Sequence, residues 1–330
     1  MQASQLQNRQ TLTAVDTALS QFYDDVISGL TSTPKHLDSK YFYDTRGDEL
    51  FQDIMNCEEY YPTDCEMEIF TEQTAALAKA IKADGTPFNL IELGAGDATK
   101  SIHLLRQLQS SGTDFTYLPI DISGHVISSL NATLPALLPG LKIRGLEGEY
   151  FNMLTEAAKS SDNRNVVLFL GSNIGNMPVH EAEDFCKVLH MHLSAGDMAL
   201  IGVDLKKNPK VILDAYNDKE GFTKQFNLNL LHRINRELDG NFDIDKFDHY
   251  PIYDPETGAC KSYLISLEDQ KVRIGGQMIS FAKDEYIHME VSQKYTVEQT
   301  NNMAAIACFK PIAEFYDSKK WFLDAIWMAL

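Results

Sequence analysis

A run of apolar residues that ends in a glycine turn is the feature that most constrains this chain. Residues 90–97 read Leu-Ile-Glu-Leu-Gly-Ala-Gly-Asp, and a helical pattern follows them. Glycines allow a tight turn with positive φ and let a ligand approach the backbone, while the amides at the start of the next helix face that ligand. We therefore predict the first strand and nucleotide loop of a Rossmann-like domain. The third glycine of the dinucleotide fingerprint is missing, which weakens the case for a dinucleotide.

A second strand that ends in an acid supports a nucleoside-type cofactor. Residues 117–121 read Tyr-Leu-Pro-Ile-Asp. Asp121 is thus expected at the C-terminal tip of a buried strand, where folds of this kind hold a ribose diol. The strand-end carboxylate of Glu92 favours S-adenosylmethionine (SAM) among such cofactors. The alternative for Asp121 is a helix N-cap or a turn residue.

Composition limits the classes of function. The 330 residues carry a formal net charge of -18. So acidic a chain repels phosphates, which argues against nucleic-acid and anionic-membrane partners and favours a small-molecule substrate. The five cysteines form neither a CxxC pair nor a zinc-like cluster, so we expect reduced thiols, no metal and a cytoplasmic protein. The polar residues 1–5 and the short apolar end, interrupted by Asp324, predict neither export nor membrane spanning.

Strand and helix patterns alternate through the middle of the chain. We predict a helix from Cys65, with Phe70, Leu77 and Ile81 on one face. The strands expected after it span 88–93, 115–120, 141–145, 166–170 and 198–204. Such alternation implies parallel βαβ units in a doubly wound α/β sheet, with ligands at the C-terminal ends of the strands.

The alternation stops after Asp204. A polar and amphipathic stretch follows, with strand-like character at 250–265 and 270–278, and we interpret it as an insertion that ends near 290–295. A helix at 297–307 and a hairpin of 312–316 and 322–328 then return to the sheet. A parallel sheet closed by an antiparallel hairpin is characteristic of class I methyltransferases, whereas NAD-dependent oxidoreductases lack the hairpin.

Five segments occur in the order found in one enzyme family. They are 41–44 (Tyr-Phe-Tyr-Asp), 59–63 (Glu-Tyr-Tyr-Pro-Thr), 92–96 (Glu-Leu-Gly-Ala-Gly), 169–176 (Phe-Leu-Gly-Ser-Asn-Ile-Gly-Asn) and 290–292 (Glu-Val-Ser). From about Pro34 onward the chain resembles the histidine-specific SAM-dependent methyltransferases. The resemblance implies a Rossmann-like class I methyltransferase sheet with a second, smaller α+β substrate domain built from the N-terminal segment and the insertion. We place the substrate domain at 12–65 plus 207–294, and the SAM-binding domain at 66–206 plus 295–330.

The resemblance also implies an activity and a set of substrate residues. The family's activity is transfer of three methyl groups to the α-amine of histidine, giving the betaine hercynine, with the substrate held between two domains. Carried onto this chain, it assigns the substrate carboxylate to Asn176 and Tyr216, and the amine to Tyr60 and Tyr43. Phe51 is expected beside the methylated nitrogen. The imidazole is assigned to Glu290 and Ser292.

On the cofactor side, the resemblance assigns Gly94 and Gly96 to the loop, Lys100 to the helix start and Asp121 to the ribose. Glu149 is expected near the adenine, and Gly171 at the methionine end of SAM. No metal is required, because methyl transfer from a sulfonium is an in-line displacement that needs alignment and the exclusion of water.

Several of these residues have structural alternatives. The aromatic residues also suit a core, Asn176 suits a turn because it follows a glycine, and Glu290 suits a solvated strand face. Glu290 and Ser292 are two apart in a strand-like run, so their side chains share a face and offer an acceptor and a hydroxyl to two imidazole nitrogens. His288 shares that face.

Three positions depart from the family's pattern. The loop continues as Asp97-Ala98-Thr99, Asn173 stands where threonine is common, and Ser262 falls at an apolar position near the imidazole pocket. A serine makes that pocket more polar or roomier, so a modified histidine or another aromatic amino acid is an alternative substrate. A non-catalytic SAM- or amino-acid-binding sensor and an NAD-dependent oxidoreductase are alternatives of other classes. We expect a monomer.

Overall fold

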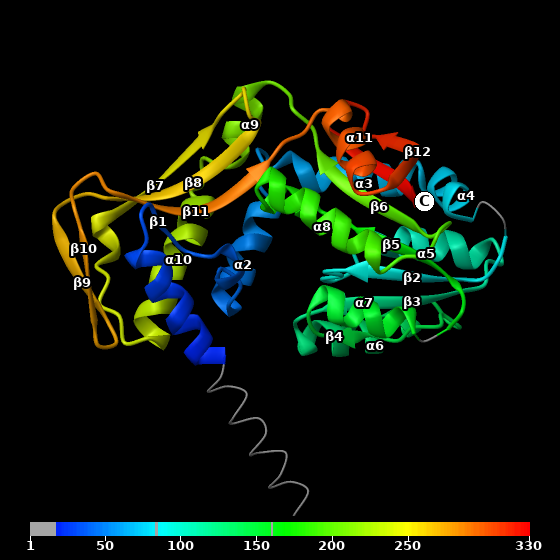
Figure 1. Ribbon diagram of the computed structural model, residues 1–330, viewed down its shortest axis with the longest axis horizontal. Helices are drawn as coiled ribbons and strands as arrows, with labels where there is room; N and C mark the ends of the chain where they lie inside the picture. Colours follow the sequence, from blue (N-terminus) through cyan, green and yellow to red (C-terminus); the bar gives the residue numbers. More distant parts are fainter. Residues whose placement is uncertain (1–17, 83–84, 160) are drawn as a thin grey trace, which may run out of the picture. The chain divides into compact units, whose positions relative to one another are not determined.

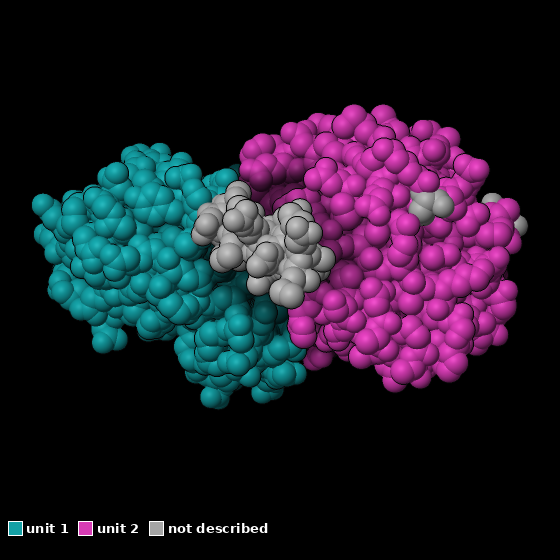
Figure 2. Space-filling model, turned by 90° about the horizontal axis from the view of Figure 1, so that it is seen from below, with its two compact units in different colours: residues 1–60, 208–292 teal, residues 61–207, 293–330 magenta. Residues whose placement is uncertain are grey.

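A computed structural model describes residues 18–82, 85–159 and 161–330, and these form two compact units. Unit 1 takes the described residues up to Tyr60 together with Asn208–Ser292, and unit 2 takes Tyr61–Lys207 and Gln293–Leu330 (Figure 2). The division falls within a few residues of the expected domain boundaries at 65/66, 206/207 and 294/295. The expected start at residue 12 and the polar residues 1–5 lie outside the described residues, and the roles expected of the two parts stay predictions.

Unit 2 is built on a seven-stranded sheet in the order β12-β13-β6-β5-β2-β3-β4 (Figure 1). The strands are β2 (Phe88–Leu93), β3 (Phe115–Asp121), β4 (Leu146–Glu147), β5 (Arg164–Phe169), β6 (Met198–Asp204), β12 (Phe309–Tyr316) and β13 (Phe322–Ala329). The five neighbouring strands β4, β3, β2, β5 and β6 pair in parallel, in that order. Strand β13 runs antiparallel to both β6 and β12. This order, with its terminal hairpin, confirms the predicted fold class.

Helices cover both faces of this sheet, so its central strands are almost continuously apolar. The helices are α3 (Tyr61–Glu72), α4 (Thr74–Lys82), α5 (Ser101–Ser110), α6 (Gly124–Leu137), α7 (Tyr150–Ala158), α8 (Val179–Met191) and α11 (Val297–Ile306), with a 3-10 turn η2 (Asn173–Asn176). Helices α7, α8 and α11 share one core cluster with the strands. Helices α3, α4 and α5 pack on one another and cover the other face (Figure 1).

Two expectations for unit 2 were wrong. The helix expected from Cys65 is two helices, and its first begins at Tyr61. It breaks before Thr74, whose hydroxyl donates to the Phe70 carbonyl and so competes for the acceptor that a continuous helix would use. The strand expected at 141–145 is only a bridge between Ile143 and Tyr117, and the paired strand lies at β4.

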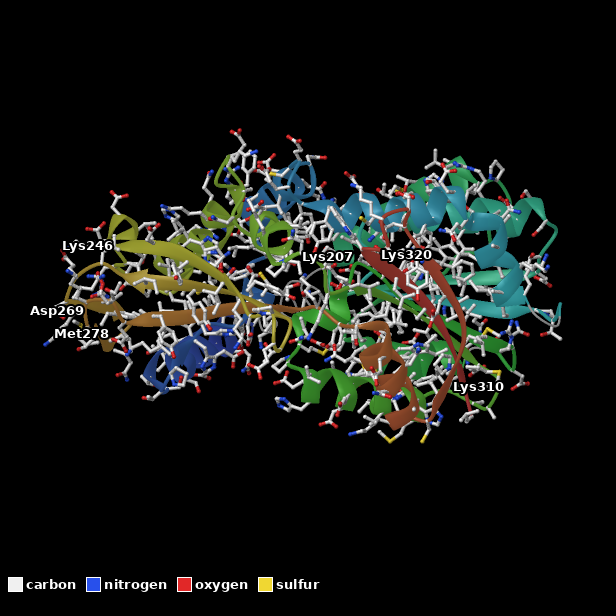
Figure 3. The ribbon with its side chains drawn as sticks, turned by 90° about the horizontal axis from the view of Figure 1, so that it is seen from above. Lys207, Lys246, Asp269, Met278, Lys310 and Lys320 are labelled. Carbon is white, nitrogen blue, oxygen red and sulfur yellow. The ribbon has the colours of Figure 1, made fainter. Side chains whose placement is uncertain are left out.

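Unit 1 contains a four-stranded sheet in the order β1-β11-β8-β7 and a separate hairpin, β9-β10. The strands are β1 (Lys35–His36), β7 (Phe247–Tyr253), β8 (Ala259–Ser266), β9 (Gln270–Ile274), β10 (Gln277–Phe281) and β11 (Tyr286–Gln293). Its helical parts are residues 18–31, α2 (Thr45–Met55), α9 (Pro209–Ala215), α10 (Phe222–Glu237) and the 3-10 turns η1 (Ser39–Tyr41) and η3 (Ile244–Lys246). Lys246, Asp269 and Met278 mark one end of this unit in Figure 3.

The core of unit 1 joins segments that are far apart in sequence. The helix at 18–31, α2 and α10 pack their apolar faces together, and strands β7 to β11 complete the same cluster. Strand β1 pairs in parallel with β11, through Lys35 with Ile287 and His36 with His288. The N-terminal segment therefore belongs to the same folded body as the insertion.

The buried carboxylate of Asp204, at the end of β6, bonds to residues at the points where the chain enters and leaves unit 2. Its Oδ2 accepts from the Tyr61 hydroxyl at 2.8 Å and pairs with Lys294 Nζ at 2.7 Å, and its Oδ1 pairs with Lys207 (labelled in Figure 3). Tyr61 and Lys207 are the first and last residues of the unit's first segment, and Lys294 is the second residue of its other segment. We call these four residues the Asp204 cluster.

No described helix has the length and apolar character needed to cross a bilayer.

Candidate active site

The predicted nucleotide loop has the geometry that its glycines require. Gly94 and Gly96 adopt φ values of 69° and 53°, in the left-handed region that favours glycine. A Cβ on Gly94 would lie 2.7 Å from the Tyr150 hydroxyl, so this position also needs the space, whereas a Cβ on Gly96 would meet nothing within 4 Å. Backbone at Gly96 is therefore open to a ligand.

Asp121 lies at the C-terminal end of β3, beside this loop. Its Oδ2 accepts from the Gly96 amide at 3.3 Å and its Oδ1 accepts from the Ser123 amide at 2.9 Å. The N-cap of the following helix is Ser123 rather than Asp121, whereas the bond to the amide two residues on is also what the turn alternative requires. The carboxylate is only partly buried, which suits an acceptor for a diol.

A buried acid that we did not expect connects two predicted cofactor residues. Both oxygens of Glu66 accept from the Gly171 amide, at 2.8 and 3.0 Å, and Glu66 also pairs with Lys100. Burial works to lower the pKa of Lys100, but the neighbouring Glu66 carboxylate raises it above its ordinary value. Glu66 therefore joins the start of α5 to the turn after β5. The sequence signal was an acid on the apolar face of α3, in line with Pro62 and Phe70.

A pocket of about 530 Å³ lies in unit 2 and brings Glu149 and Asn176 together. Its lining is Glu149, Tyr150, Phe151, Asn152, Phe169, Asn173, Asn176, Met177 and Phe185. The rings of Phe169 and Phe185 stack at 4.6 Å, and Asn176 Nδ2 donates to Asn173 Oδ1 at 3.3 Å. Aromatic walls with a few amide and carboxylate groups suit a planar heterocycle such as adenine.

Glu92 of β2 is buried, and its Oε2 accepts from the Tyr117 hydroxyl at 2.5 Å. Burial raises the pKa of Glu92 from its ordinary 4.5 to about 7, although the Tyr117 hydrogen bond opposes this. Between these two values the folded protein keeps a proton that the unfolded chain has lost. The free energy of unfolding therefore falls as the pH rises through this window.

We expect Glu92→Gln, which cannot ionise, to remove this effect. At about pH 8 the variant should exceed the wild type in free energy of unfolding by at most about 3 kcal/mol, and near pH 4 the two should agree. Urea denaturation at both values measures the difference. The exposed Glu156→Gln is the control, and a Glu92→Gln effect that is equal at both pH values would contradict the assignment.

In unit 1, two of the predicted substrate residues gather around Phe226 of α10. The ring of Tyr43 lies 5.7 Å from Phe51 and 5.7 Å from Phe226, in edge-on geometry, and Phe51 lies 5.9 Å from Phe226. Phe226 is buried, whereas Tyr43 is 48% exposed. The structure thus places Tyr43 and Phe51 side by side, with an aromatic surface that can face a cationic amine. Phe226 was not expected.

A second group joins Tyr60, Tyr216 and Ser292. The Tyr216 hydroxyl donates to Ser292 Oγ at 2.7 Å, and the rings of Tyr60 and Tyr216 meet edge-on at 6.2 Å. Tyr216 and Ser292 are both buried. Asn176, the other predicted carboxylate ligand, belongs to unit 2.

Glu290 is half-buried rather than fully solvated, and its Oε1 accepts from Asn227 Nδ2 at 3.3 Å. Asn227 lies on α10 and was not expected; its signal was an amide in the apolar stripe of Phe226, Leu230 and Ile234. Ser262 is buried as well, and its Oγ has no hydrogen-bond partner among the described residues. The two residues predicted for the imidazole, Glu290 and Ser292, thus each have a polar neighbour within unit 1.

The sheet order, the glycine loop and the strand-end acid define a class I SAM-dependent methyltransferase. A family described as "Histidine-specific methyltransferase, SAM-dependent" matches residues 22–329, and the chain belongs to this family. The predicted family, cofactor and class of enzyme are confirmed. The residues fit SAM: Gly96 leaves the loop open, Asp121 offers a carboxylate beside it, and the pocket holds Glu149.

Three relatives are similar over most of this chain. The histidine N-alpha-methyltransferase of Mycobacterium tuberculosis is 37% identical over 82% of this chain and 83% of its own length. That of Mycolicibacterium smegmatis is 34% identical over 86% of this chain and 88% of its own length. Ergothioneine biosynthesis protein 1 of Neurospora crassa is 31% identical over 86% of this chain, which corresponds to 32% of that protein.

Proposed function

We propose that this enzyme transfers methyl groups from SAM to the α-amine of L-histidine, in successive steps that give N,N,N-trimethylhistidine (hercynine). The observation that carries the proposal is the pairing of Glu290 and Ser292 on β11, each with a polar partner, in a chain whose other unit has the cofactor loop. The relatives named as histidine N-alpha-methyltransferases support the same substrate and nitrogen.

When bound, SAM supplies a methyl group on a positively charged sulfur. Gly94, Gly96 and Asp121 are proposed to hold its ribose end, Glu149 its adenine, and Lys100 with Gly171 its methionine end. Lys100 and Gly171 are already joined through Glu66, which fixes their positions before a ligand arrives. Pre-set geometry of this kind lowers the cost of alignment for an in-line displacement.

The substrate side must orient a neutral amine and then release its proton. The phenols of Tyr60 and Tyr43 are proposed to orient the amine lone pair, with water as the proton acceptor, because an α-amine titrates near pH 8. The methylated nitrogen is cationic, and the faces of Phe51 and Tyr43 stabilise such a cation by about 0.5–2 kcal/mol. Tyr216 and Asn176 are proposed as neutral donors to the carboxylate.

Mass spectrometry of the protein with SAM and a mixture of amino acids tests the proposal. The mixture contains histidine, its methylated forms and tryptophan. Histidine that gains three methyl masses would support the full reaction, and an arrest at one methyl would limit it to the first step. Absence of any methylated product, with SAM bound, would contradict the proposal and favour a non-catalytic sensor.

The unpartnered hydroxyl of Ser262 favours one second candidate, a histidine derivative with an additional polar group. Such a derivative would give the hydroxyl a partner, since buried polar atoms are normally hydrogen-bonded. Faster turnover of a ring-substituted histidine than of histidine would favour this candidate. A Ser262→Met variant, which restores an apolar side chain, should then reverse the preference.

Replacing Glu290 by alanine is expected to raise the KM for histidine about tenfold, because a hydrogen bond to a charged group contributes about 1.5 kcal/mol or more. The preference for histidine over tryptophan should fall with it, while the KM for SAM stays unchanged. Steady-state kinetics with both amino acids measure the two effects. An unchanged preference would favour another aromatic amino acid as the substrate.

The substrate is a small molecule, and we further propose a cytoplasmic monomer without nucleic-acid or membrane partners. The net charge of -18 supports the exclusion of anionic partners. Light scattering coupled to size-exclusion chromatography tests the oligomeric state, and a dimer mass would contradict it.

A further inference from the structure

Buried polar groups gather where α10 packs on β7 and β8 in unit 1. Three of them carry a side-chain atom that has no hydrogen-bond partner among the described residues: Asn227 Oδ1, His249 Nε2 and Ser262 Oγ. We call these three residues the polar layer. Two of them, Asn227 and Ser262, are at most 1% exposed. Buried polar atoms are normally paired, so an unpaired set in one region calls for an explanation.

Strand register places two members of the polar layer on one face of the sheet. His249 is opposite Leu264, and Ser262 is opposite Pro251, so His249 and Ser262 are diagonal neighbours. Leu264 belongs to the same core cluster as Phe226 of α10. Asp248 on β7, Asp218 just before α10 and Lys224 in its first turn all act electrostatically on His249. Helix α10 therefore packs on the strands that carry His249 and Ser262.

Asn227 connects the polar layer to Glu290. Its Nδ2 donates to the Thr223 carbonyl at 3.0 Å, within its own helix, and to Glu290 Oε1 at 3.3 Å, on β11. Asn227 is fully buried, on the face of the helix that also buries Leu230, Leu231 and Ile234. A fully buried amide that is held at one end by its own helix has a fixed direction, and that direction sets the position of the carboxylate oxygen it contacts.

We propose that Asn227 is a positioning residue for substrate recognition: it holds the Glu290 carboxylate in the orientation that accepts an imidazole N–H. The polar layer behind it disfavours a phenyl ring, which offers no hydrogen bond, and an indole, whose single N–H can pair with only one of these atoms. The inference rests on the proposed function, in which Glu290 receives the imidazole. It adds a residue that acts through Glu290.

A double-mutant cycle between Asn227 and Glu290 tests this role. Asn227→Leu keeps the side-chain size and removes the amide. In the wild-type background we expect the KM for histidine to rise about tenfold, with kcat and the affinity for S-adenosylhomocysteine unchanged. In the Glu290→Gln background the same change should alter the KM less than about twofold, because a residue that acts through Glu290 has little left to lose there.

The matched control is Asn229→Leu, since Asn229 is another buried amide of α10 that donates to a different carboxylate, Asp44, at 2.8 Å. It should change the KM for histidine less than about twofold. If Asn227→Leu fails to fold, Asn227→Ala replaces it with the same criteria. Calorimetric titration of each variant with S-adenosylhomocysteine, and then with histidine, gives a readout that does not depend on turnover.

Equal rises in KM in both backgrounds would overturn the positioning role, and so would an unchanged KM in Asn227→Leu. Wild-type turnover of histidine distinguishes failure of the Asn227 role from failure of the proposed function. If the wild type methylates histidine and the cycle is additive, only this inference fails. If the wild type does not methylate histidine, the proposed function fails, and the role of Asn227 fails with it.

Discussion

Replacing Asp121 by alanine is expected to raise the KM for SAM about 100-fold and to leave the KM for histidine unchanged. A carboxylate that accepts from both ribose hydroxyls contributes about 3 kcal/mol, and each 1.4 kcal/mol is a factor of ten. Asp121 is suited to this role because it lies at the end of β3 and its Oδ2 already contacts the Gly96 amide. Calorimetric titration with S-adenosylhomocysteine measures the loss directly.

Asp97 offers a matched control for this prediction. It is an exposed acid of the same loop, and its Oδ1 accepts from the Thr99 amide at 3.0 Å. Asp97→Ala should change the affinity for S-adenosylhomocysteine by less than about fivefold, because only a local turn is lost. Equal losses in the two variants would mean that Asp121 supports the loop rather than the ribose.

Replacing Asp204 by alanine is expected to lower the free energy of unfolding by about 3–5 kcal/mol, because it leaves buried cations without their counter-charge. Lys294 is fully buried and Lys207 nearly so, and both pair with Asp204. The pKa of Lys207 lies below its ordinary value because burial disfavours its charge, even with Asp204 beside it. Urea denaturation at neutral pH measures the change.

An exposed pair in the same unit is the control. Asp184 and Lys187 pair at 2.8 Å on the surface of α8, and Asp184→Ala should leave the free energy of unfolding almost unchanged, because solvent screens an exposed pair. An equally small change for Asp204→Ala would mean that the two lysines find other partners or solvent, and that Asp204 does not stabilise them.

The sheet of unit 2 could be predicted because its signals are local. Each of its central strands is a short apolar run, and the glycine turn and the terminal hairpin have their own composition. The break between α3 and α4 could not be predicted in this way, because Thr74 suits a helix as well as it suits an interruption. Strand β4 was displaced for a related reason: only two of its residues pair, so a sequence pattern hardly records it.

Two of the three residues missed in the site, Glu66 and Asn227 but not Phe226, share one physical property. Glu66 and Asn227 are polar side chains inside helices, where such residues usually face solvent, and their partners lie far away in sequence. Glu66 accepts from the amide of Gly171, and Asn227 donates to Glu290. Only the tertiary fold brings each pair together. By contrast, Asp121 ends an apolar strand about two dozen residues after the glycine loop, and this spacing could be recognised in the sequence.

Strand order also determines how this enzyme can be made. In unit 2, β13 inserts between β6 and β12, and in unit 1, β1 pairs with β11. The sheet of unit 1 is incomplete until β11 has been synthesised, and that of unit 2 until β13 has been synthesised. Until then the apolar strand β6 is an unprotected edge open to aggregation. The long sequence separation also predicts slow folding. Expression at low temperature or with added chaperones should therefore raise the soluble yield, and a contiguous fragment will not reproduce unit 1.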